Sequence, residues 1–504
     1  NVGTGKTVNI TSSYSGTDAG NYSVTDQSST TADISTKALT ATASASNKTY
    51  DGGTTANTTL TFSGLIGSET LGQTVGSTFD NKNVGSNKTI SVNSITLADG
   101  TNGGLAANYS ISAGQTTTAH IAPKSLTVSG NTASNKIYDS NSSATVTVTL
   151  SGFVGSETLT YTNSSSFNNK TGGTGKTVTV DSISLADGNN GGLASNYSVA
   201  PGQTTTANIT AKALTVSGIT ASSKTYDGST SATLDTSSVL YSGLIAGDTF
   251  NGTYTGAFSD KNVGTGKTVT ITSSYSGADS GNYSVTNQSS TTADISSKAL
   301  TATASVSNKT YDATNSATAT LTLAGLVGSE TLGSTNTSTF NNKNVGSNKT
   351  VTVNSITLAD GSNGGLAANY SISAGQTTTA NITAKSLTVS GITASNKAYD
   401  GNSVASLDVS SVAYSGLVSG DTFNGTYTGA FSNKNVGVGK TVTITPSYSG
   451  ADVSNYSITN HADVTANITA KSLTVSGITA SSKTYDGSTS ATLDTSSVLY
   501  SGLI

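Results

Sequence analysis

The sequence predicts an all-β protein, a tandem array of small sandwich-like or barrel-like domains, and three observations lead to this prediction. A Lys-(Ala/Ser)-Leu-Thr tetrapeptide recurs about every 87 residues along the chain. Between its copies, short stretches alternate apolar and polar residues with period two, which is the pattern of half-buried strands. Gly-, Asn- and Asp-containing turns separate these stretches about every 8–12 residues, and no stretch places apolar residues at helical spacing.

The tetrapeptide also sets the domain boundaries. Its lysines are Lys37, Lys124, Lys212, Lys298, Lys385 and Lys471. They define five complete units, 37–123, 124–211, 212–297, 298–384 and 385–470, with a C-terminal part of a unit at 1–36 and an N-terminal part at 471–504. Residues 214–245 and 473–504 are identical over 32 positions, which indicates tandem duplication. We therefore expect the chain to be a window from a longer array.

A unit of this size can enclose a core of its own, whereas one coil of a β-helix cannot. The sequence therefore predicts independently folded domains rather than a solenoid. Residues 380–389, at a boundary, contain neither Pro nor Gly, and Ile382 has the opposite strand parity to Leu387 and Val389. The two sets should face opposite sides of an extended chain, as when the last strand of one domain runs straight into the first strand of the next. Such short junctions predict a stiff array.

The first half of each unit carries a Lys-x-Tyr-Asp motif. We expect its Tyr to bury its ring near a strand end and to hydrogen-bond its hydroxyl, while the Asp begins a turn through its side chain. The Phe that precedes Asn-Val-Gly should also lie in the core. These residues are Tyr50, Tyr138, Tyr226, Tyr311, Tyr399 and Tyr485, and Phe79, Phe258, Phe340 and Phe431.

The second half of unit 298–384 begins with a strand at 350–353, where Thr and Val alternate. Asn354-Ser355 then shifts the alternation before it resumes at 356–358, which predicts a β-bulge or corner. In the first unit, 103–108 could form one helical turn. The Tyr of each Asn-Tyr-Ser sequence is expected to pack in the core; these are Tyr22, Tyr109, Tyr197, Tyr283, Tyr370 and Tyr456.

The chain opens with NVGTGKT, which ends like a phosphate-binding P-loop. A P-loop needs a Gly five positions before its final Gly, but Lys261 and Lys170 occupy that position before Gly266 and Gly175. The motif also precedes a strand rather than a helix. Two copies have Asn in place of the last Gly, and these two residue types best tolerate a left-handed turn. The motif is therefore interpreted as a hairpin turn.

Composition excludes several functional classes. Charged residues make up 10% of the chain, the net charge is −4, and all 23 basic residues are Lys, so there is no basic surface for nucleic acid. The absence of Cys excludes disulfides and thiolate metal sites. No run of 18 apolar residues occurs, so no membrane-spanning helix is expected in this segment.

Three loops of the type Asp-Gly-x-Asn-Gly-Gly contain the candidate metal ligands Asp99, Asp187 and Asp360. Asp, Asn and backbone carbonyl oxygens in a Gly-rich loop are ligands that Ca²⁺ accepts. However, each loop has one carboxylate and no closing Glu, so a plain Gly-Asn turn is the alternative, and no other cofactor is expected.

His120 and His461 each occur in one unit only, so neither belongs to a repeated catalytic or metal constellation. Intramolecular Lys–Asn isopeptide bonds are a further kind of site to consider. They need a buried acid, and Glu occurs only at Glu69, Glu157 and Glu330, although an Asp could replace it.

Several blocks of each unit resemble the YDG repeat domain and its MBG relatives. In the third unit these are Lys-Ala-Leu-Thr-Val-Ser-Gly-Ile-Thr-Ala-Ser-Ser-Lys-Thr-Tyr-Asp-Gly (212–228), Gly-Asp-Thr-Phe (247–250), Asp-Lys-Asn-Val-Gly-Thr-Gly-Lys-Thr (260–268), Gly-Asn-Tyr-Ser-Val (281–285) and Thr-Ala-Asp-Ile (292–295). Two units depart from the motif, with Ser140 and Ala313 in place of its Gly, which favours a turn over a reactive site.

The resemblance implies small immunoglobulin-like or β-grasp-like domains of large bacterial surface or secreted proteins, many of them filamentous-haemagglutinin-like adhesins. The sequence thus predicts a non-enzymatic, extracellular stalk or fibre segment that spaces distal modules, with neighbouring repeats as its contacts. Strands of ~9–10 residues suggest roughly 30–40 Å per domain. One alternative is a biofilm matrix filament in which copies associate through edge strands. Another is a glycan- or ice-binding repeat.

Overall fold

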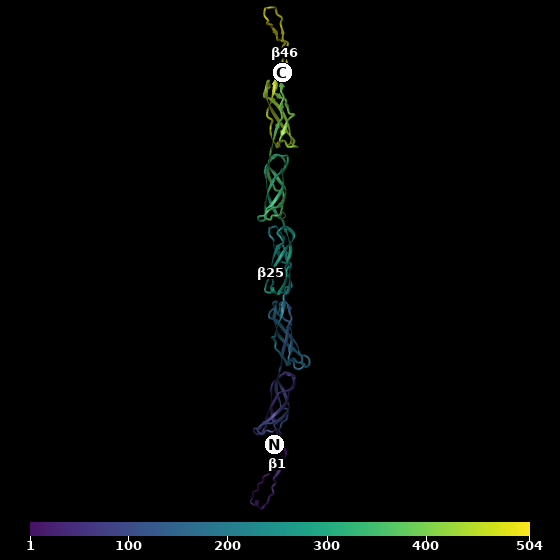
Figure 1. The fold of residues 1–504 in the computed structure, drawn as a ribbon, viewed down its shortest axis with the longest axis vertical. Coiled ribbons are helices and arrows are strands. Elements are labelled where there is room, and N and C mark those ends of the chain that lie inside the picture. Colours follow the sequence, from purple (N-terminus) through teal and green to yellow (C-terminus); the bar gives the residue numbers. More distant parts are fainter. The chain divides into compact units, whose positions relative to one another are not determined.

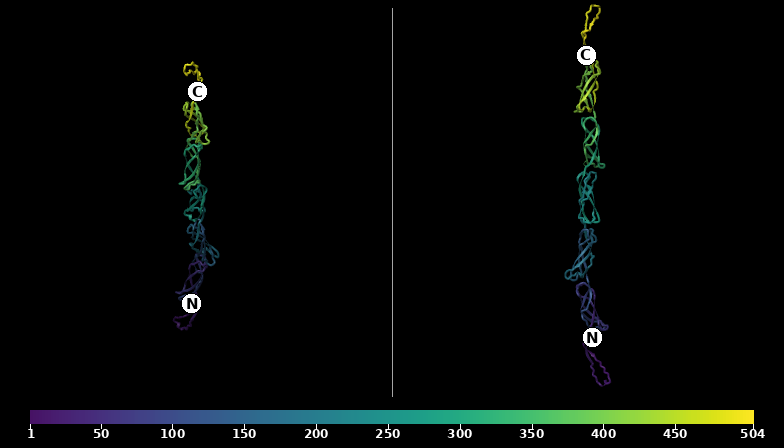
Figure 2. Two further views of the ribbon diagram at one scale, coloured as in Figure 1. Left: turned by 45° about the horizontal axis from the view of Figure 1, so that its top comes forward. Right: turned by 180° about the vertical axis from the view of Figure 1, so that it is seen from behind.

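The computed structural model describes residues 1–504, and almost every regular element is a β-strand (Figure 1). The helical elements are six 3-10 turns of three residues each. One of them, η2 (Ala106–Asn108), lies where the sequence predicts a helical turn. None of these helices is long or apolar enough to cross a lipid bilayer. The all-β prediction is confirmed, and the two further views of Figure 2 show the same strand-rich ribbon in each complete repeat.

The chain divides into two compact units, which are described separately. The first contains Asn1–Gly218, Ser238–Tyr254 and Ser273–Gln288, and the second contains Ile219–Ser237, Thr255–Thr272 and Ser289–Ile504. The division therefore falls inside the third predicted repeat, 212–297, and not between two repeats. Repeats 1 to 5 below denote the five complete units predicted from the sequence.

The N-terminal part and the first two repeats lie in the first unit. Their elements are β1 (Gly3–Asn9), η1 (Ala19–Asn21) and β2 (Ser29–Ile34); β3 (Lys37–Ala38), β4 (Thr40–Ala45), β5 (Lys48–Thr49), β6 (Thr58–Ser63), β7 (Leu71–Phe79), β8 (Gly85–Asp99), η2, β9 (Tyr109–Ser110) and β10 (Thr116–Ala122); and β11 (Lys124–Ala133), β12 (Lys136–Ile137), β13 (Val146–Ser151), β14 (Thr160–Phe167), β15 (Gly173–Ala186), η3 (Ala194–Asn196), β16 (Tyr197–Val199) and β17 (Thr204–Thr210).

Repeat 3 contributes elements to both units. They are β18 (Lys212–Ser217), β19 (Thr220–Ala221), β20 (Lys224–Thr225), β21 (Ser231–Ala232), β22 (Leu234–Asp235), β23 (Leu240–Ser242), β24 (Asn251–Phe258), β25 (Gly264–Ser276), η4 (Ser280–Asn282), β26 (Tyr283–Thr286) and β27 (Ser290–Ser296).

The remaining elements belong to the second unit. Repeat 4 has β28 (Lys298–Val306), β29 (Lys309–Thr310), β30 (Ser316–Ala317), β31 (Ala319–Ala324), β32 (Leu332–Phe340), β33 (Gly346–Asp360), η5 (Ala367–Asn369), β34 (Tyr370–Ile372) and β35 (Thr377–Thr383). Repeat 5 has β36 (Lys385–Ser390), β37 (Thr393–Ala394), β38 (Lys397–Ala398), β39 (Val404–Ala405), β40 (Leu407–Asp408), β41 (Ala413–Ser415), β42 (Asn424–Phe431), β43 (Gly437–Ser449), η6 (Val453–Asn455), β44 (Tyr456–Thr459) and β45 (Val464–Thr469). The C-terminal part has β46 (Thr474–Ser476), β47 (Thr479–Ala480), β48 (Leu493–Asp494) and β49 (Leu499–Ser501).

Repeat 4 shows the topology of a complete repeat. One sheet has the order β31-β28-β34 and the other has the order β29-β35-β33-β32-β30. The first strand, β28, pairs antiparallel with β31 and parallel with β34, whereas β35 pairs antiparallel with β33 and parallel with β29. The repeat therefore consists of two sheets, with no helix beyond a three-residue turn.

A long hairpin, β32–β33, runs through repeat 4. Thr337 of β32 pairs with Ser355 of β33, and the next residue, Ser338, pairs with Val353. Asn354 is therefore the extra residue of a β-bulge. This bulge is where the sequence predicts it. However, β33 has 15 residues, more than the expected 9 or 10, because the chain continues through the bulge without breaking the ladder.

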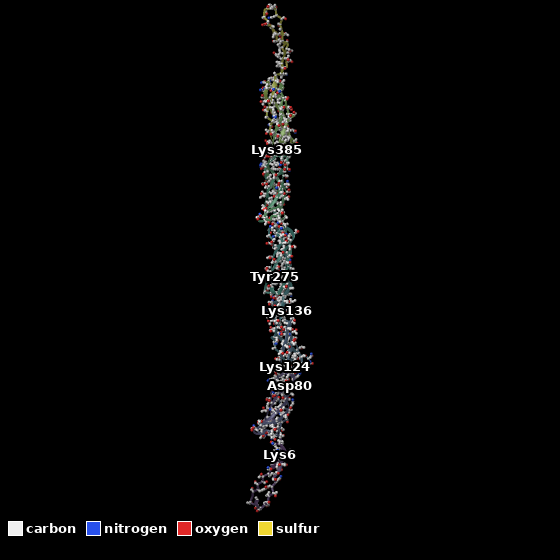
Figure 3. All side chains as sticks on the ribbon, in the orientation of Figure 1. Lys6, Asp80, Lys124, Lys136, Tyr275 and Lys385 are labelled. Atoms are coloured by element: carbon white, nitrogen blue, oxygen red, sulfur yellow. The ribbon has the colours of Figure 1, made fainter.

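Consecutive repeats are joined by adjacent strands, as the junction sequence predicts. A single residue, Ala384, separates β35 from β36, and a single residue, Pro123, separates β10 from β11. Figure 3 labels Lys124 and Lys385, the first residues of β11 and β36. Since one residue cannot form a flexible linker, the two repeats at each junction are directly adjoining.

Candidate functional site: the inter-repeat junction

The Lys-x-Tyr-Asp motif forms a fixed turn beside the junction. In repeat 3, β20 pairs in parallel with the end of β27, and the Tyr226 backbone N–H donates to Ser296. The Lys224 ammonium lies 2.8 Å from Asp227 Oδ1, and Asp227 also accepts the Ser229 N–H. Burial alone would raise the pKa of Asp227, but these hydrogen bonds outweigh it and lower the pKa to about 2. The Asp side chain therefore closes a turn, as expected.

The residue after Tyr-Asp has a left-handed backbone in every repeat, with φ between +66° and +84°. A Cβ on Gly228 would lie only 2.7 Å from Val327 of the following repeat. Ser140 and Ala313 adopt the same conformation in repeats 2 and 4, and the Ser140 hydroxyl donates to Asp248 of repeat 3. The motif thus faces the next repeat.

A buried carboxylate of the next repeat receives the motif tyrosine. Tyr226 and Tyr370 donate to the two oxygens of Glu330 at 2.7 and 2.6 Å, and the Lys261 ammonium lies 3.0 Å from the same group. The two tyrosine rings meet edge to face with centroids 5.4 Å apart. Tyr226 and Lys261 belong to repeat 3, whereas Glu330 and Tyr370 belong to repeat 4. The first junction repeats this arrangement with Tyr50, Lys82, Glu157 and Tyr197.

The other two complete junctions use a pair of Asp residues in place of Glu. Tyr311 donates to Asp421 at 3.1 Å, Tyr456 donates to the other oxygen of Asp421 at 2.5 Å, and Lys343 lies 2.9 Å from Asp452. The equivalent residues at the second junction are Tyr138, Lys170, Asp248, Asp279 and Tyr283. Both carboxylate arrangements therefore satisfy the same two tyrosine hydroxyls and one lysine.

The pKa shifts follow from this geometry. Burial alone would raise the pKa of Glu330, but hydrogen bonds from Tyr370, Tyr226 and Lys261 outweigh it and hold the pKa below its ordinary value. Burial and the hydrogen bond to Glu330 raise the pKa of Tyr370 to about 12. At neutral pH the cluster therefore contains an ionised carboxylate, an ammonium and two neutral phenols.

A buried Asn forms a second connection at each junction. Asn369 accepts the Val263 backbone N–H at 2.9 Å and donates to Asn262 of the preceding repeat. The Asn is the first residue of an Asn-Tyr-Ser sequence, so it is held next to the buried Tyr370 by the turn η5. Its counterparts are Asn108, Asn196, Asn282 and Asn455, which accept backbone N–H groups of Val2, Val84, Gly172 and Val345.

The hydrophobic core continues across the junction. One cluster combines Tyr226, Phe258, Val269, Ala293 and Ile295 of repeat 3 with Leu300 and Tyr370 of repeat 4. A second cluster combines Tyr311, Phe340, Val351, Ala380 and Ile382 of repeat 4 with Leu387, Phe423 and Tyr456 of repeat 5. A third joins repeats 1 and 2. The expectation that each repeat has a separate core therefore fails at these junctions, where a Leu and a Tyr of one repeat complete a cluster of the repeat before it, although repeat 5 also has two clusters of its own.

Most of the predicted core aromatics are buried. The Phe residues Phe79, Phe258, Phe340 and Phe431 are buried, and so are Tyr109, Tyr197, Tyr283, Tyr370 and Tyr456. Tyr226 is 1% exposed, whereas Tyr485 in the C-terminal part is 94% exposed and Tyr399 of repeat 5 is half-buried. Tyr22, in the N-terminal part, is 76% exposed, so the prediction of core packing is wrong for Tyr22 and Tyr485.

The Gly-Lys-Thr motif lies in the connection of a hairpin, as interpreted, and it also forms a β-bulge against a third strand. In repeat 4 the ladder between β32 and β33 ends at Phe340 and Val351, and Asn348, with φ +51°, lies in the segment between them. The register between β33 and β35 shifts there, and the Asn348 N–H donates to the Asn381 side chain at 2.8 Å. The left-handed conformation was correctly expected; the register shift depends on pairing with a distant strand.

Each predicted calcium ligand closes its own loop. Asp99, Asp187 and Asp360 accept the backbone N–H groups of Ala106, Ala194 and Ala367, each at 2.7 Å. No group of three or more His, Cys, Asp or Glu side chains forms a metal-binding cluster. Calcium binding at these loops stays a prediction, which calorimetric titration with CaCl₂ can test.

The two histidines lie apart from any catalytic group. His120 replaces an Asn or Asp of other repeats, and its ring Nδ1 accepts the Asn87 N–H at the bulge. His461 is half-buried and contacts the carbonyl of Ala462. His120 therefore performs the hydrogen-bonding task that Asn381 performs in repeat 4.

The junction carboxylates and lysines were not recognised from the sequence. The available signal was that all three Glu residues occur in Gly-Ser-Glu-Thr-Leu, and that Asp occupies the corresponding place in repeats 3 and 5. In a chain with so few charged residues, an acidic residue that recurs at the same position of every repeat indicates a fixed role for that position.

The fold and the junctions together define a tandem array of β-sandwich repeats. A family model described as the YDG domain matches residues 35–119, 122–207, 210–293, 296–380 and 383–466. These matches cover most of the sequence, and the chain belongs to the YDG domain family. The domain limits 37–123 through 385–470 remain predictions.

Two further comparisons complete this result. No curated protein is similar to the chain. Among solved structures, surface layer protein SbsC, domains 4–9, matches 86% of this chain and 84% of its own, with 11% identity and a TM-score of 0.16. A score this low supports no structural argument.

Proposed function

We propose that the chain is a structural spacer of an extracellular bacterial surface or secreted protein, which holds distal modules away from their anchor. The observation that carries the proposal is the junction: adjacent repeats share a buried core and a Tyr–carboxylate–Lys cluster, with one residue between their strands. Such contacts limit independent motion of neighbouring repeats, which is what a spacer requires. The extracellular and adhesin-like setting rests on the resemblance of the repeat motifs to those of large bacterial surface proteins.

The spacer function predicts that length grows by a constant step per repeat. A strand of 13–15 residues, such as β25 or β33, extends about 45 Å. Deleting repeat 3 (212–297) should therefore shorten the purified chain by one such step in negative-stain or atomic-force images. Equal lengths with and without repeat 3, or a collapsed particle, would contradict the proposal. Antibody labelling of intact producing cells tests the location separately.

A matrix filament is the second candidate, because three repeats have edge strands of six residues without a charged side chain: β6, β13 and β31. Uncharged edges of this kind favour association between chains. However, Gln73 donates to the Leu60 carbonyl and accepts the Leu60 N–H, so it occupies the free edge of β6. Single threads at all concentrations in the images above would support the spacer, and concentration-dependent lateral bundles would support the matrix.

A further inference from the structure

The buried residues at the two ends of a repeat belong to different hydrophobic clusters. In repeat 4, Leu300 and Tyr370 lie in the cluster shared with repeat 3, whereas Tyr311, Phe340 and Ile382 lie in the cluster shared with repeat 5. Val353 is buried between them and belongs to neither of these two clusters. We call the first set the head of the repeat and the second set its tail. These buried side chains of repeat 4 are thus divided between its neighbours, whereas repeat 5 also has a cluster of its own, Val389, Ile392 and Ile444, which packs against residues of both clusters beside it.

Polar contacts follow the same division. The head contributes Glu330 and Asn369, which bind Tyr226, Lys261 and Val263 of repeat 3. The tail contributes Tyr311, Lys343 and the Val345 N–H, which bind Asp421, Asp452 and Asn455 of repeat 5. Head and tail are connected by the backbone ladder of the β32–β33 hairpin, which contains the Asn354 bulge, and by the ladder between β28 and β31.

The division into two compact units agrees with this arrangement. It separates residues 212–218, 238–254 and 273–288 of repeat 3 from residues 219–237, 255–272 and 289–297. The first set is grouped with repeat 2, and the second set with repeat 4. The boundary between the two compact units therefore lies within repeat 3, whereas the sequence period places the domain boundaries between repeats.

Repeat 5 provides an internal comparison. Its tail cluster contains Ala405, Phe431, Val442, Ala466 and Ile468, all from repeat 5 itself, with Tyr399 only half-buried at its side. No hydroxyl contact of Tyr399 matches that of Tyr311 with Asp421. Within this chain, the tail of repeat 4 therefore shares its cluster with the head of the next repeat, whereas the cluster of the repeat 5 tail contains residues of repeat 5 alone.

We infer that the cooperative folding unit of this array is a junction-centred module, the tail of one repeat together with the head of the next, and that the YDG motif is the docking element of this module. The surface presented by a tail fits one kind of partner, the head of another YDG repeat with its carboxylate, Asn and Tyr. This inference is independent of where the protein works and of what it spaces.

Hydrogen exchange with mass spectrometry on the full chain tests the inference, with Ile382→Ala as the perturbation. Ile382 is 1% exposed in the tail of repeat 4. The substitution should speed exchange about thirty-fold in that tail and equally in β36 and β44 of repeat 5, because losing a buried aliphatic side chain weakens the whole cooperative unit. Exchange in β34, in the head of repeat 4, should change less than three-fold.

Ile468→Ala is the matched control, since Ile468 occupies the same place in the tail of repeat 5 without a neighbouring head in its cluster. It should speed exchange in the tail of repeat 5 alone. Tyr311→Phe is a milder variant that keeps the ring and removes only the hydroxyl contacts with Asp421 and Asp452. It should speed exchange in β44, whereas Tyr399→Phe should have no effect there. Loss of protection in both halves of repeat 4 with repeat 5 unchanged would overturn the inference, and so would uniform loss along the chain.

Discussion

At the scale of single residues, the Asn of each Asn-Tyr-Ser sequence has the most sharply defined task. Asn369 is 1% exposed, accepts the Val263 N–H and donates to Asn262. Truncation of this side chain leaves a backbone donor of the neighbouring repeat without a partner in a buried place. An unsatisfied buried group of this kind costs about 1–3 kcal/mol.

Asn369→Ala should therefore destabilise the junction between repeats 3 and 4 by about 1–3 kcal/mol, as measured from the denaturant dependence of hydrogen exchange in that region. Asn21→Ala is the control, because Asn21 occupies the same motif but is exposed. Equal effects of the two substitutions would show that the motif acts only within its own turn.

The bulge residue gives a second test at this scale. Gly266 has φ +58° and its N–H donates to Asp294, whereas other repeats place Asn at the same position. Gly266→Asn should leave stability nearly unchanged, because Asn adopts the left-handed region readily. Gly266→Val should cost about 1–2 kcal/mol, since a side chain with a branched Cβ is strained there. Local hydrogen exchange in β25 and β27 measures both, and similar behaviour of the two variants would contradict the bulge assignment.

At the scale of elements, the open edges of the sandwiches are closed by side chains. Gln73 of β7 forms two hydrogen bonds with the backbone of Leu60 in β6, at 3.1 and 2.8 Å. In repeat 2, Asn163 donates to Val146, and in repeat 4, Asn336 donates to Ala319. These amides occupy positions that another strand would need for pairing.

Gln73→Ala should therefore expose the edge of β6 and raise self-association of the purified chain. Sedimentation velocity over a concentration series measures the effect, and Gln27→Ala, in an exposed loop, is the matched control. A chain that stays monomeric after Gln73→Ala would show that the amide does not protect this edge.

Sequence patterns predicted the positions of the strands and bulges better than they predicted which strands pair with each other. The extra residue at Asn354 and the left-handed Asn348 were both recognisable, because a bulge breaks the period-two alternation and Asn or Gly is preferred at positive φ. The pairing of β33 with β35 was not recognisable, so the bulge that the hairpin segment forms against β35 was missed. Local preferences describe the backbone conformation of one segment but not the strand that lies beside it.

At the scale of the whole molecule, the junction clusters determine how the array responds to pH. The pKa values of Glu157, Glu330 and Asp452 are held low in the folded chain, so their stabilising contribution is present above the ordinary carboxyl range and is lost as the pH falls through the lowered values. The pKa values of Tyr197 and Tyr370 are raised from 10.0 to about 12, so their contribution is present below pH 10.0 and is lost as the pH rises through about 12.

Urea midpoints should therefore form a plateau between about pH 5 and 10 and fall on both sides. Glu330→Gln should lower the plateau and reduce the acid-side loss at the third junction, since an amide does not ionise. An unchanged midpoint from pH 3 to 7 would mean that the carboxylates contribute little to folding. Intact mass in the same samples tests the isopeptide alternative, because each such bond removes one ammonia.

The sequence by itself determined the all-β class, the repeat period and the identity of most core aromatics, because periodicity and turn chemistry are properties of short segments. Only the tertiary structure decided which copy of a residue meets which. Tyr226 reaches Glu330, 104 positions away, although acidic residues of its own repeat lie much nearer in sequence. In a chain of near-identical repeats, a contact within one repeat and a contact with the next have the same local pattern. Packing geometry distinguishes them, and it joined the tail of each repeat to the head of the following one.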